Sequence, residues 1–214
     1  IKTLDLENCI ITIDAIGCQK SITKLIIENK ADYILCAKDN HEALRNIIEF
    51  NLSEESRYYL CHAKRYFEEN KGHGRSEYRE CVCISAKNLQ YFLKGWTGIK
   101  TLAMINSIRK MGDKEAVMET RYYISSLEPD PIIILKSIRS HWEVENNLHW
   151  VLDIGFREDD DRKTGNAAIN FSAISKLALM LLKQSDIKLG MAGKRKACGW
   201  DEKIRDKDIG IKKI

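Results

Sequence analysis

Two carboxylates in the sequence stand where an acidic side chain could take part in chemistry, and Asp14 is the first of them. It directly follows a short run rich in β-branched residues, CIITI at 9–13, which predicts a buried strand. Active sites of open α/β sheets gather at the carboxyl ends of strands, so Asp14 is a candidate catalytic residue. Aspartate at such a position also caps helices and forms turns, and position alone favours that structural interpretation.

The second carboxylate, Glu145, falls in a predicted helix. Asp130-Pro131 is a typical helix start, because aspartate caps well and proline is favoured at the first helical position. The helix is expected to reach about Leu152. Steps of four, three, four and three place one set of residues on a single face: Ile138, Trp142, Glu145, His149 and Leu152. Glu145 should therefore point inwards, where a carboxylate needs a cation or hydrogen-bond partners; a salt-bridged structural glutamate is the alternative.

Metal binding near Glu145 has more than one interpretation. His141, Glu145 and His149 are four residues apart and lie close on a helix, which could suggest zinc. A single helix rarely supplies three ligands, however, and oxygen ligands alone suit magnesium better. The acidic run at 158–161 is typical of a solvated loop, with a metal role as the alternative. A second candidate zinc site consists of Cys61, His62, His73, Cys81 and Cys83. The spacing of these residues matches no common zinc module.

The first third of the chain predicts a strand, a helix and a strand in close succession. Residues 18–29 have helical spacing of apolar side chains, and 32–38 form a second β-branched, apolar run. Such a βαβ unit favours a parallel sheet. Residues 39–56 are again helical in pattern, strands are expected within 96–107 and 119–126, and a second apolar helix is expected over about 167–183.

Basic side chains cluster in two places that suggest contacts with nucleic acid. Residues 57–87 predict a hairpin around Gly72-His73-Gly74. It carries Lys64, Arg65, Lys71, Arg75 and Arg79 interleaved with Tyr58, Tyr59, Tyr66, Phe67 and Tyr78, which could bind phosphates and stack on unpaired bases. Lys194, Arg195 and Lys196 form the second patch, and Lys38 ends the second strand. The alternatives are a solvated hairpin with core aromatics, a plain charged tail and a surface lysine.

Composition narrows the class of protein. The 214 residues include 35 basic and 31 acidic side chains, a net charge of +4 that permits DNA binding without requiring it. No apolar run of about 18 residues predicts a membrane span. Seven cysteines with no CxxC pair indicate reduced thiols in a cytosolic protein. The chain opens on Ile1 in what resembles the middle of a domain, so upstream sequence is expected to be missing.

Several segments occur together in an order that resembles a known family. They are TIDAIGCQK at 12–20, YILCAKDN at 33–40, GHGRSEYRE at 72–80, RYYISSL at 121–127, HWEVENNLHWVLDIGFREDDDR at 141–162, NAAINFSAISKLALMLLK at 166–183 and GKRKACGWD at 193–201. Together they are similar to the H-repeat-associated insertion-sequence transposases, a DDE group with an RNase-H-like fold. The likeness covers nearly the whole chain, and the long histidine–tryptophan segment is quite specific.

The resemblance implies roles for particular residues. The family's second catalytic aspartate falls on Asp14 and its glutamate on Glu145, as ligands of Mg²⁺ or Mn²⁺ in two-metal phosphodiester chemistry. His141, Trp142 and His149 become possible supporting residues. The family's first aspartate would lie upstream of Ile1, so the chain is expected to be a truncated fragment, inactive alone.

The resemblance also implies an organisation and partners. The expected fold is α/β, an RNase-H-like mixed sheet flanked by helices, with its core divided between 1–56 and 127–192. A β-rich insertion with a returning strand is expected at 57–126, and a basic tail at 193–214. The implied partners are the terminal inverted repeats of the element and target DNA, in the cytoplasm with the nucleoid, and a homodimer is possible. The alternatives are a non-catalytic DNA-binding relic and a nuclease of the same fold.

Overall fold

The computed structural model describes residues 5–53, 56, 62–72, 74–112, 114–158, 160 and 162–209, apart from the side chains of 145, 146 and 207–209. It divides into two compact units, Ile1–His141 and Trp142–Ile214. Unit 1 contains a mixed sheet with helices, and unit 2 is helical. No helix in the described ranges is long and apolar enough to cross a membrane.

Unit 1 begins with the predicted βαβ unit. Strand β1 (Ile10–Ile13) pairs in parallel with β2 (Asp32–Ala37), and α1 (Lys20–Glu28) connects them. A short 3₁₀ turn, η2 (Asp39–His41), leads into α2 (Glu42–Leu52). The prediction of a parallel pair is confirmed. Because both strands run the same way, residues that follow them lie at the same edge of the sheet.

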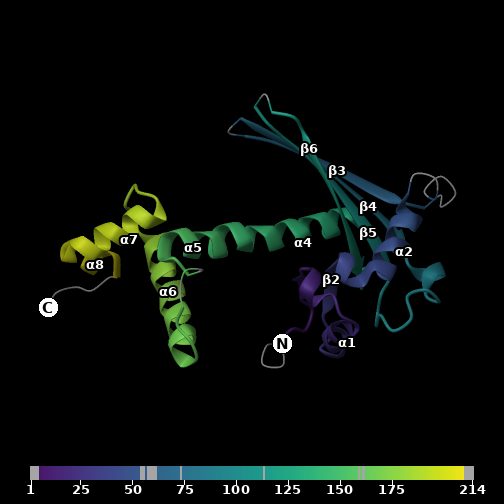
Figure 1. The fold of residues 1–214 in the computed structure, drawn as a ribbon, viewed down its shortest axis with the longest axis horizontal. Coiled ribbons are helices and arrows are strands. Elements are labelled where there is room, and N and C mark those ends of the chain that lie inside the picture. Colours follow the sequence, from purple (N-terminus) through teal and green to yellow (C-terminus); the bar gives the residue numbers. More distant parts are fainter. Residues whose placement is uncertain are drawn as a thin grey trace. The chain divides into compact units, whose positions relative to one another are not determined.

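The β-rich segment extends this same sheet. Strands β3 (Lys64–Gly72), β4 (Arg75–Ser85), β5 (Thr101–Met111) and β6 (Val117–Ser125) pair antiparallel, and β6 also pairs with β2. The sheet order in the described chain is β1-β2-β6-β5-β4-β3. The distal parts of β3 to β6 extend past the helices that cover β1 and β2 (Figure 1). The predicted hairpin is confirmed, and the expected α/β class with a mixed sheet is confirmed as well.

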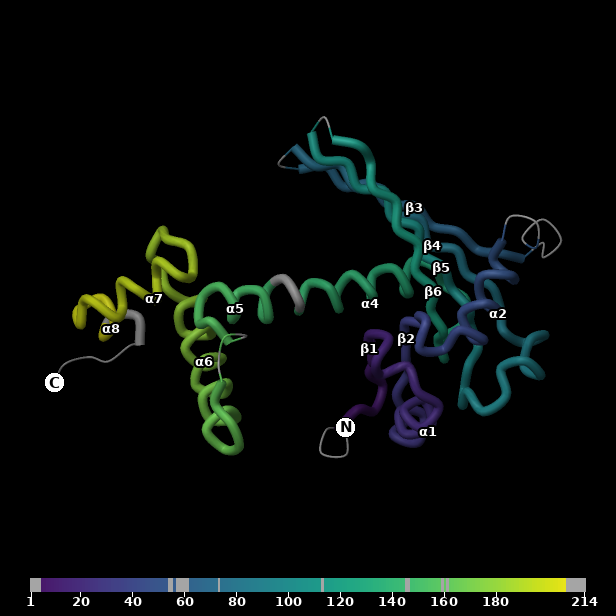
Figure 2. Tube along the Cα trace, in the orientation of Figure 1, coloured from purple at the N-terminus to yellow at the C-terminus, as the bar shows by residue number. Residues whose placement is uncertain are grey.

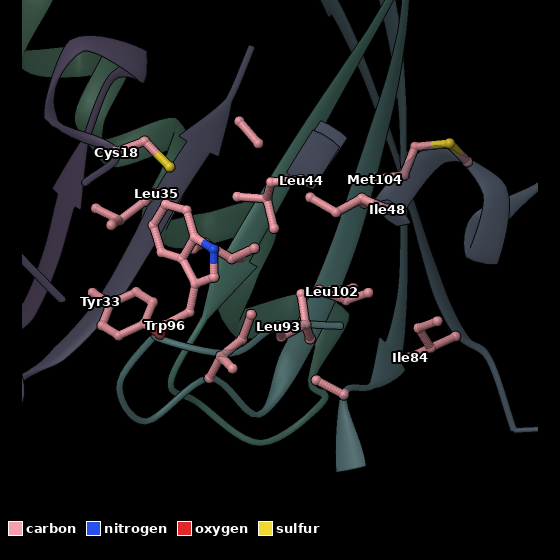
Figure 3. Close-up of a cluster of buried hydrophobic side chains, with 14 of the residues drawn as sticks. Cys18, Tyr33, Leu35, Leu44, Ile48, Ile84, Leu93, Trp96, Leu102 and Met104 are labelled. Atoms are coloured by element: carbon pink, nitrogen blue, oxygen red, sulfur yellow. The ribbon is translucent and has the colours of Figure 1, made fainter. Parts of the chain in front are cut away.

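Two apolar clusters cover the two faces of the sheet. On one face, here called the α2 face, Ile48 of α2 packs with Tyr33, Leu35 and other side chains (Figure 3). Ile26 of α1 belongs to the same cluster. On the other, the α4 face, α4 (Pro131–Val144) packs Ile134, Leu135 and Ile138 against a cluster from the strands: Ile34, Cys36, Cys81, Cys83, Ala103, Ile105 and Tyr123. Alternation of side chains along each strand thus assigns every sheet residue to one face or the other.

The start of α4 follows the sequence closely. Oδ1 of Asp130 accepts hydrogen bonds from the backbone amides of Ile132 and Ile133, at 2.9 and 3.1 Å. These bonds satisfy two of the amides that a helix leaves unpaired at its start. The predicted cap is therefore confirmed, and it fixes where α4 leaves the sheet.

Unit 2 consists of helical segments. After α4 come the π-helical segment η4 (Glu145–His149) and α5 (Trp150–Phe156), and then α6 (Asn166–Gln184), α7 (Met191–Trp200) and α8 (Glu202–Ile209). Figure 2 shows α6 at a steep angle to α5. The predicted apolar helix at 167–183 is confirmed as α6, and the segment from Gly193 to Ile209 lies in α7 and α8, which Asp201 separates.

We predict that the buried thiols resist alkylation in the folded protein. Burial raises the pKa of Cys18, and likewise that of Cys83, to about 12, so at pH 8 only about one thiol in 10⁴ is the reactive thiolate. Iodoacetamide with peptide mass spectrometry should modify exposed Cys9 within minutes, and Cys18 and Cys83 only after guanidinium is added. Equal labelling of all three in native buffer would contradict the burial.

Candidate active site at the end of strand β1

Asp14 lies where the sequence analysis expected it, at the carboxyl end of β1. It is the residue before the 3₁₀ turn η1 (Ala15–Gly17) and has an extended backbone. Nδ2 of Asn40 donates a 2.7 Å hydrogen bond to the carbonyl of Ala15, which joins the turn after β1 to the segment after β2. The side chain of Asp14 remains 51% exposed, so its carboxylate is accessible to a ligand.

A backbone amide and two cations stabilise the ionised form of Asp14. Nζ of Lys38, which follows β2, lies 3.3 Å from Oδ1 of Asp14. Partial burial works to raise the pKa of Asp14, but the amide of Ala15, the ammonium of Lys38 and the guanidinium of Arg121 outweigh it, and the pKa is lowered. Lys38, predicted at the end of the second strand, thus lies beside Asp14. Arg121 of β6 was missed, because only the β2–β6 register brings it to this edge.

A polar contact joins the end of α4 to the same strand. Oγ1 of Thr12 and Nδ1 of His141 are 3.2 Å apart. Thr12 is two residues before Asp14 and so shares its face. Its register partner Ile34 packs against α4, so this is the α4 face. His141 therefore reaches the sheet beside Asp14, in a role that its spacing along the helix did not reveal.

Glu145 is the first residue of the π-helical segment η4, and its side chain lies outside the described residues. The predicted stripe assumed an unbroken α-helix. Ile138 and Leu152 are buried, whereas Trp142 and His149 are exposed. A π turn inserts extra residues and shifts which side chains share a face, so the expected stripe does not continue through η4. Isolated π turns often occur at functional sites.

The zinc interpretations find no further support in the described residues. Among the described side chains there is no group of three or more histidine, cysteine, aspartate or glutamate residues suited to a metal. Cys61 and His73 lie outside the described residues, as do Asp159 and Asp161 of the acidic run. Cys81 and Cys83 are buried in the sheet, and burial raises the pKa of both thiols. Deprotonating them to bind zinc would be correspondingly costly.

The hairpin residues proposed for DNA binding divide between the two faces. Lys64, Arg75 and Arg79 alternate with the buried Cys81 and Cys83 and lie on the α4 face with Asp14. Arg65 is on the α2 face, 3.8 Å from Glu80. Arg79 is only 17% exposed and pairs with glutamates.

The aromatic residues of the hairpin also divide. Phe67 and Tyr78 stack on each other, with ring centroids 6.0 Å apart, on the α2 face. Tyr66 packs against the α4-face cluster. Tyr58 and Tyr59 lie outside the described residues. The predicted stacking on unpaired bases would need aromatic rings grouped beside Asp14. The described side chains of the hairpin form no such group.

The three residues of the second basic patch, at 194–196, differ in their exposure. Lys194 is buried in α7, and its Nζ donates to the carbonyls of Ser185 and Leu182 at 2.6 and 3.2 Å. These carbonyls lie at the end of α6, where a cation is favourable. Arg195 and Lys196 are exposed. A contact with DNA at this patch thus rests on Arg195 and Lys196.

We predict that Lys194→Ala destabilises unit 2 while Lys196→Ala does not. Removing the ammonium leaves two carbonyls without their partner and should cost about 1–3 kcal/mol. The neighbouring exposed lysine is a matched control, expected to change stability by less than about 0.5 kcal/mol. Urea unfolding followed by circular dichroism measures both. Equal effects of the two substitutions would show that the buried ammonium does not stabilise the end of α6.

Comparison with known proteins identifies the family. The family model described as "Transposase DDE domain" matches residues 1–182. The chain belongs to this DDE transposase family. The six-stranded mixed sheet with helices on both faces is consistent with the RNase-H-like fold expected of a DDE transposase.

Curated relatives agree with the family. "Putative transposase YncI" of Escherichia coli O157:H7 is 40% identical over 203 residues, covering 92% of this chain and 51% of the relative. "H repeat-associated putative transposase YhhI" of E. coli K12 is 36% identical over 214 residues, covering 94% of this chain and 54% of the relative. The predicted resemblance to H-repeat-associated transposases is confirmed. The chain spans about half the length of these curated relatives.

Proposed function

We propose that this chain supplies part of the active site of an insertion-sequence transposase that cuts and joins DNA. Asp14 and Glu145 act in it as ligands of Mg²⁺ or Mn²⁺, and the substrates are the element's terminal inverted repeats and target DNA. The observation that carries the proposal is Asp14 itself. It is an ionised, half-exposed carboxylate at the carboxyl end of a parallel strand, paired with Lys38, in a chain of the DDE family.

The chemistry of Asp14 suits a hard divalent cation. Asp14 is ionised at neutral pH, and carboxylate oxygen is the donor that Mg²⁺ and Mn²⁺ prefer. The ammonium of Lys38 beside Oδ1 indicates that this position favours positive charge. A bound divalent pair would supply an activated hydroxyl nucleophile and neutralise charge on the phosphate.

Glu145 is assigned as the second ligand from its place in the family motif and along the chain. It comes four residues after His141, whose ring contacts Thr12 on the face of Asp14. Glu145 is also the first residue of the π-helical segment. Within that segment, the carbonyl of Asn147 accepts a 3.0 Å hydrogen bond from Nζ of Lys183 in α6. We propose that this bond fixes the conformation of η4 and thereby the position of Glu145.

The residues of this chain have distinct proposed tasks. Asp14 and Glu145 hold the metal, and Lys38 neutralises charge beside it. His141 holds the end of α4 on the sheet through Thr12. Lys64, Arg75, Arg195 and Lys196 are proposed to contact DNA, with a homodimer as the proposed assembly on two element ends.

A chimera in which the rest of YhhI completes this chain tests the proposal. With a labelled terminal-repeat duplex, it should nick and join DNA in Mg²⁺ or Mn²⁺ and lose all activity in EDTA. Glu145→Gln should abolish activity, and Glu143→Gln, an exposed neighbour, should retain it. Activity that persists in EDTA, or in Glu145→Gln, would refute the proposal.

A further inference from the structure

A row of arginines crosses the α4 face of the sheet from Asp14 outwards. The strand register gives the order of these side chains along β4. Arg121 of β6 lies across the sheet from Cys81, and Arg79 is two residues further out along β4. Arg109 of β5 pairs with Glu77, and Arg75 is at the distal end of β4. Arg139 of α4 joins the row by pairing with Glu68 of β3. The sequence spreads these five arginines over 65 residues, so only the strand register shows that they form one row.

Glutamates on the same face hold these arginines in place. Oε2 of Glu77 lies 2.8 Å from Arg75, and its Oε1 lies 2.6 Å from Arg79 and 3.3 Å from Arg109. Glu68 pairs with both Arg79, at 3.5 Å, and Arg139. Glu119 lies 2.7 Å from Arg121. Each guanidinium is thereby anchored at one side, which reduces the entropy lost when it binds a ligand.

The row keeps positive charge and donors in excess. Among the described residues, five arginines share three glutamates. Arg79 is only 17% exposed and its Nη1 is buried, so it holds the glutamates within the row, and the outward donors come from the more exposed arginines. Arg75 and Arg109 keep side chains 41% and 51% exposed. A guanidinium carries five N–H donors, so pairing with a shared carboxylate leaves several of them for another acceptor. Forked donors of this kind suit phosphate oxygens.

We propose that this arginine row binds the phosphodiester backbone of the DNA whose reacting bond lies at Asp14. The inference rests on the proposed function and extends it to Arg109, Arg121 and Arg139. Six residues of β4 separate the level of Arg121 from that of Arg75, a span of about 20 Å at ~3.3 Å per residue. One strand of a duplex places roughly six phosphates along that length.

The α2 face offers a matched control within the same strand. Lys110 follows Arg109 directly, is also exposed, and points to the opposite face. Arg109→Ala and Lys110→Ala therefore remove one positive charge each from adjacent positions. If the row binds DNA, only the first change should matter, whereas general attraction to a basic protein would make the two changes equal.

The experiment measures binding of the full chain to a fluorescent 20-base-pair duplex by anisotropy across a range of salt concentrations. Arg109→Ala should weaken binding about five- to tenfold at 100 mM salt and lower the log–log salt slope by about 0.9. Arg109→Ala with Arg121→Ala should lower it by about 1.8. Lys110→Ala should leave both quantities unchanged. Arg109→Lys, which keeps the charge, should retain the slope and guards against a folding defect in the alanine variant.

Unchanged affinity and slope in both arginine variants, or an equal loss in Lys110→Ala, would overturn the inference. The outcome is separable from the proposed function, because Asp14→Asn tests catalysis in the YhhI chimera. If Asp14→Asn abolishes cleavage while the arginine variants bind normally, the row is refuted and the function stands. If the arginine variants lose binding while Asp14→Asn cleaves normally, the function fails and the row stands.

Discussion

Asp14→Asn is expected to lower DNA cleavage by the YhhI chimera at least about 10³-fold while leaving DNA binding intact. The amide keeps the shape of the side chain but removes the negative charge that holds a divalent cation, and loss of metal stabilisation is worth several kcal/mol in the transition state. Cleavage of a labelled duplex under single-turnover conditions measures the rate, and anisotropy measures binding.

Asp39→Asn provides the control for that substitution. Asp39 follows β2 at the same edge of the sheet, is highly exposed and pairs with Arg45 at 2.6 Å. Its loss removes an equal charge near the site and should change the cleavage rate less than about twofold. Wild-type cleavage by Asp14→Asn, or an equal loss in Asp39→Asn, would remove Asp14 from the active site.

Glu77→Gln is expected to destabilise unit 1 by about 2–4 kcal/mol at pH 7, because it leaves three arginines without their shared, nearly buried carboxylate. Burial works to raise the pKa of Glu77, but Arg79, Arg75 and Arg109 outweigh it, and the pKa is lowered. The carboxylate therefore stabilises the fold above its ordinary pKa of 4.5, and this stabilisation is lost as pH falls through the lower folded value.

Urea unfolding at several pH values tests this dependence. The difference between wild type and Glu77→Gln should be largest near pH 7 and shrink below about pH 4.5. Glu69→Gln is the control: this exposed glutamate of the same hairpin pairs with Lys71 and should cost less than about 0.5 kcal/mol. A difference for Glu77→Gln that is independent of pH would show that charge pairing does not stabilise this part of the sheet.

Local patterns predicted the elements well because each had a local physical cause. The β-branched run before Asp14 formed β1, Asp130 capped α4, and the glycines around position 73 closed the β3–β4 hairpin. The sheet order did not follow from such patterns. Pairing of β6 between β2 and β5 joins residues far apart in the sequence, and no periodicity within a segment encodes that choice.

The residues of the candidate site divide in the same way, into those that a local pattern predicts and those that depend on strand pairing. The positions of Asp14 and Lys38 at the ends of β1 and β2 were predicted from the sequence, because each follows a recognisable strand, but the proposed role of Asp14 came from the resemblance to the family. Arg121 and Thr12 were not, since their relevance depends on register and on the packing of α4. The hairpin arginines were interpreted as free phosphate ligands, but a sequence cannot show that Arg79 pairs with two glutamates. Helical spacing likewise gave no sign of the π turn at Glu145.

Iron-directed backbone cleavage tests most directly whether Asp14 and Glu145 share a metal. Fe²⁺ can replace Mg²⁺ at oxygen ligands, and with ascorbate and peroxide it generates radicals that cut the polypeptide close to the ion. A shared metal predicts cuts near both Asp14 and Glu145 in this chain, suppressed by millimolar Mg²⁺ and absent in Asp14→Asn. Cuts near only one of the two residues, or cuts near both that persist in Asp14→Asn, would contradict a shared metal site.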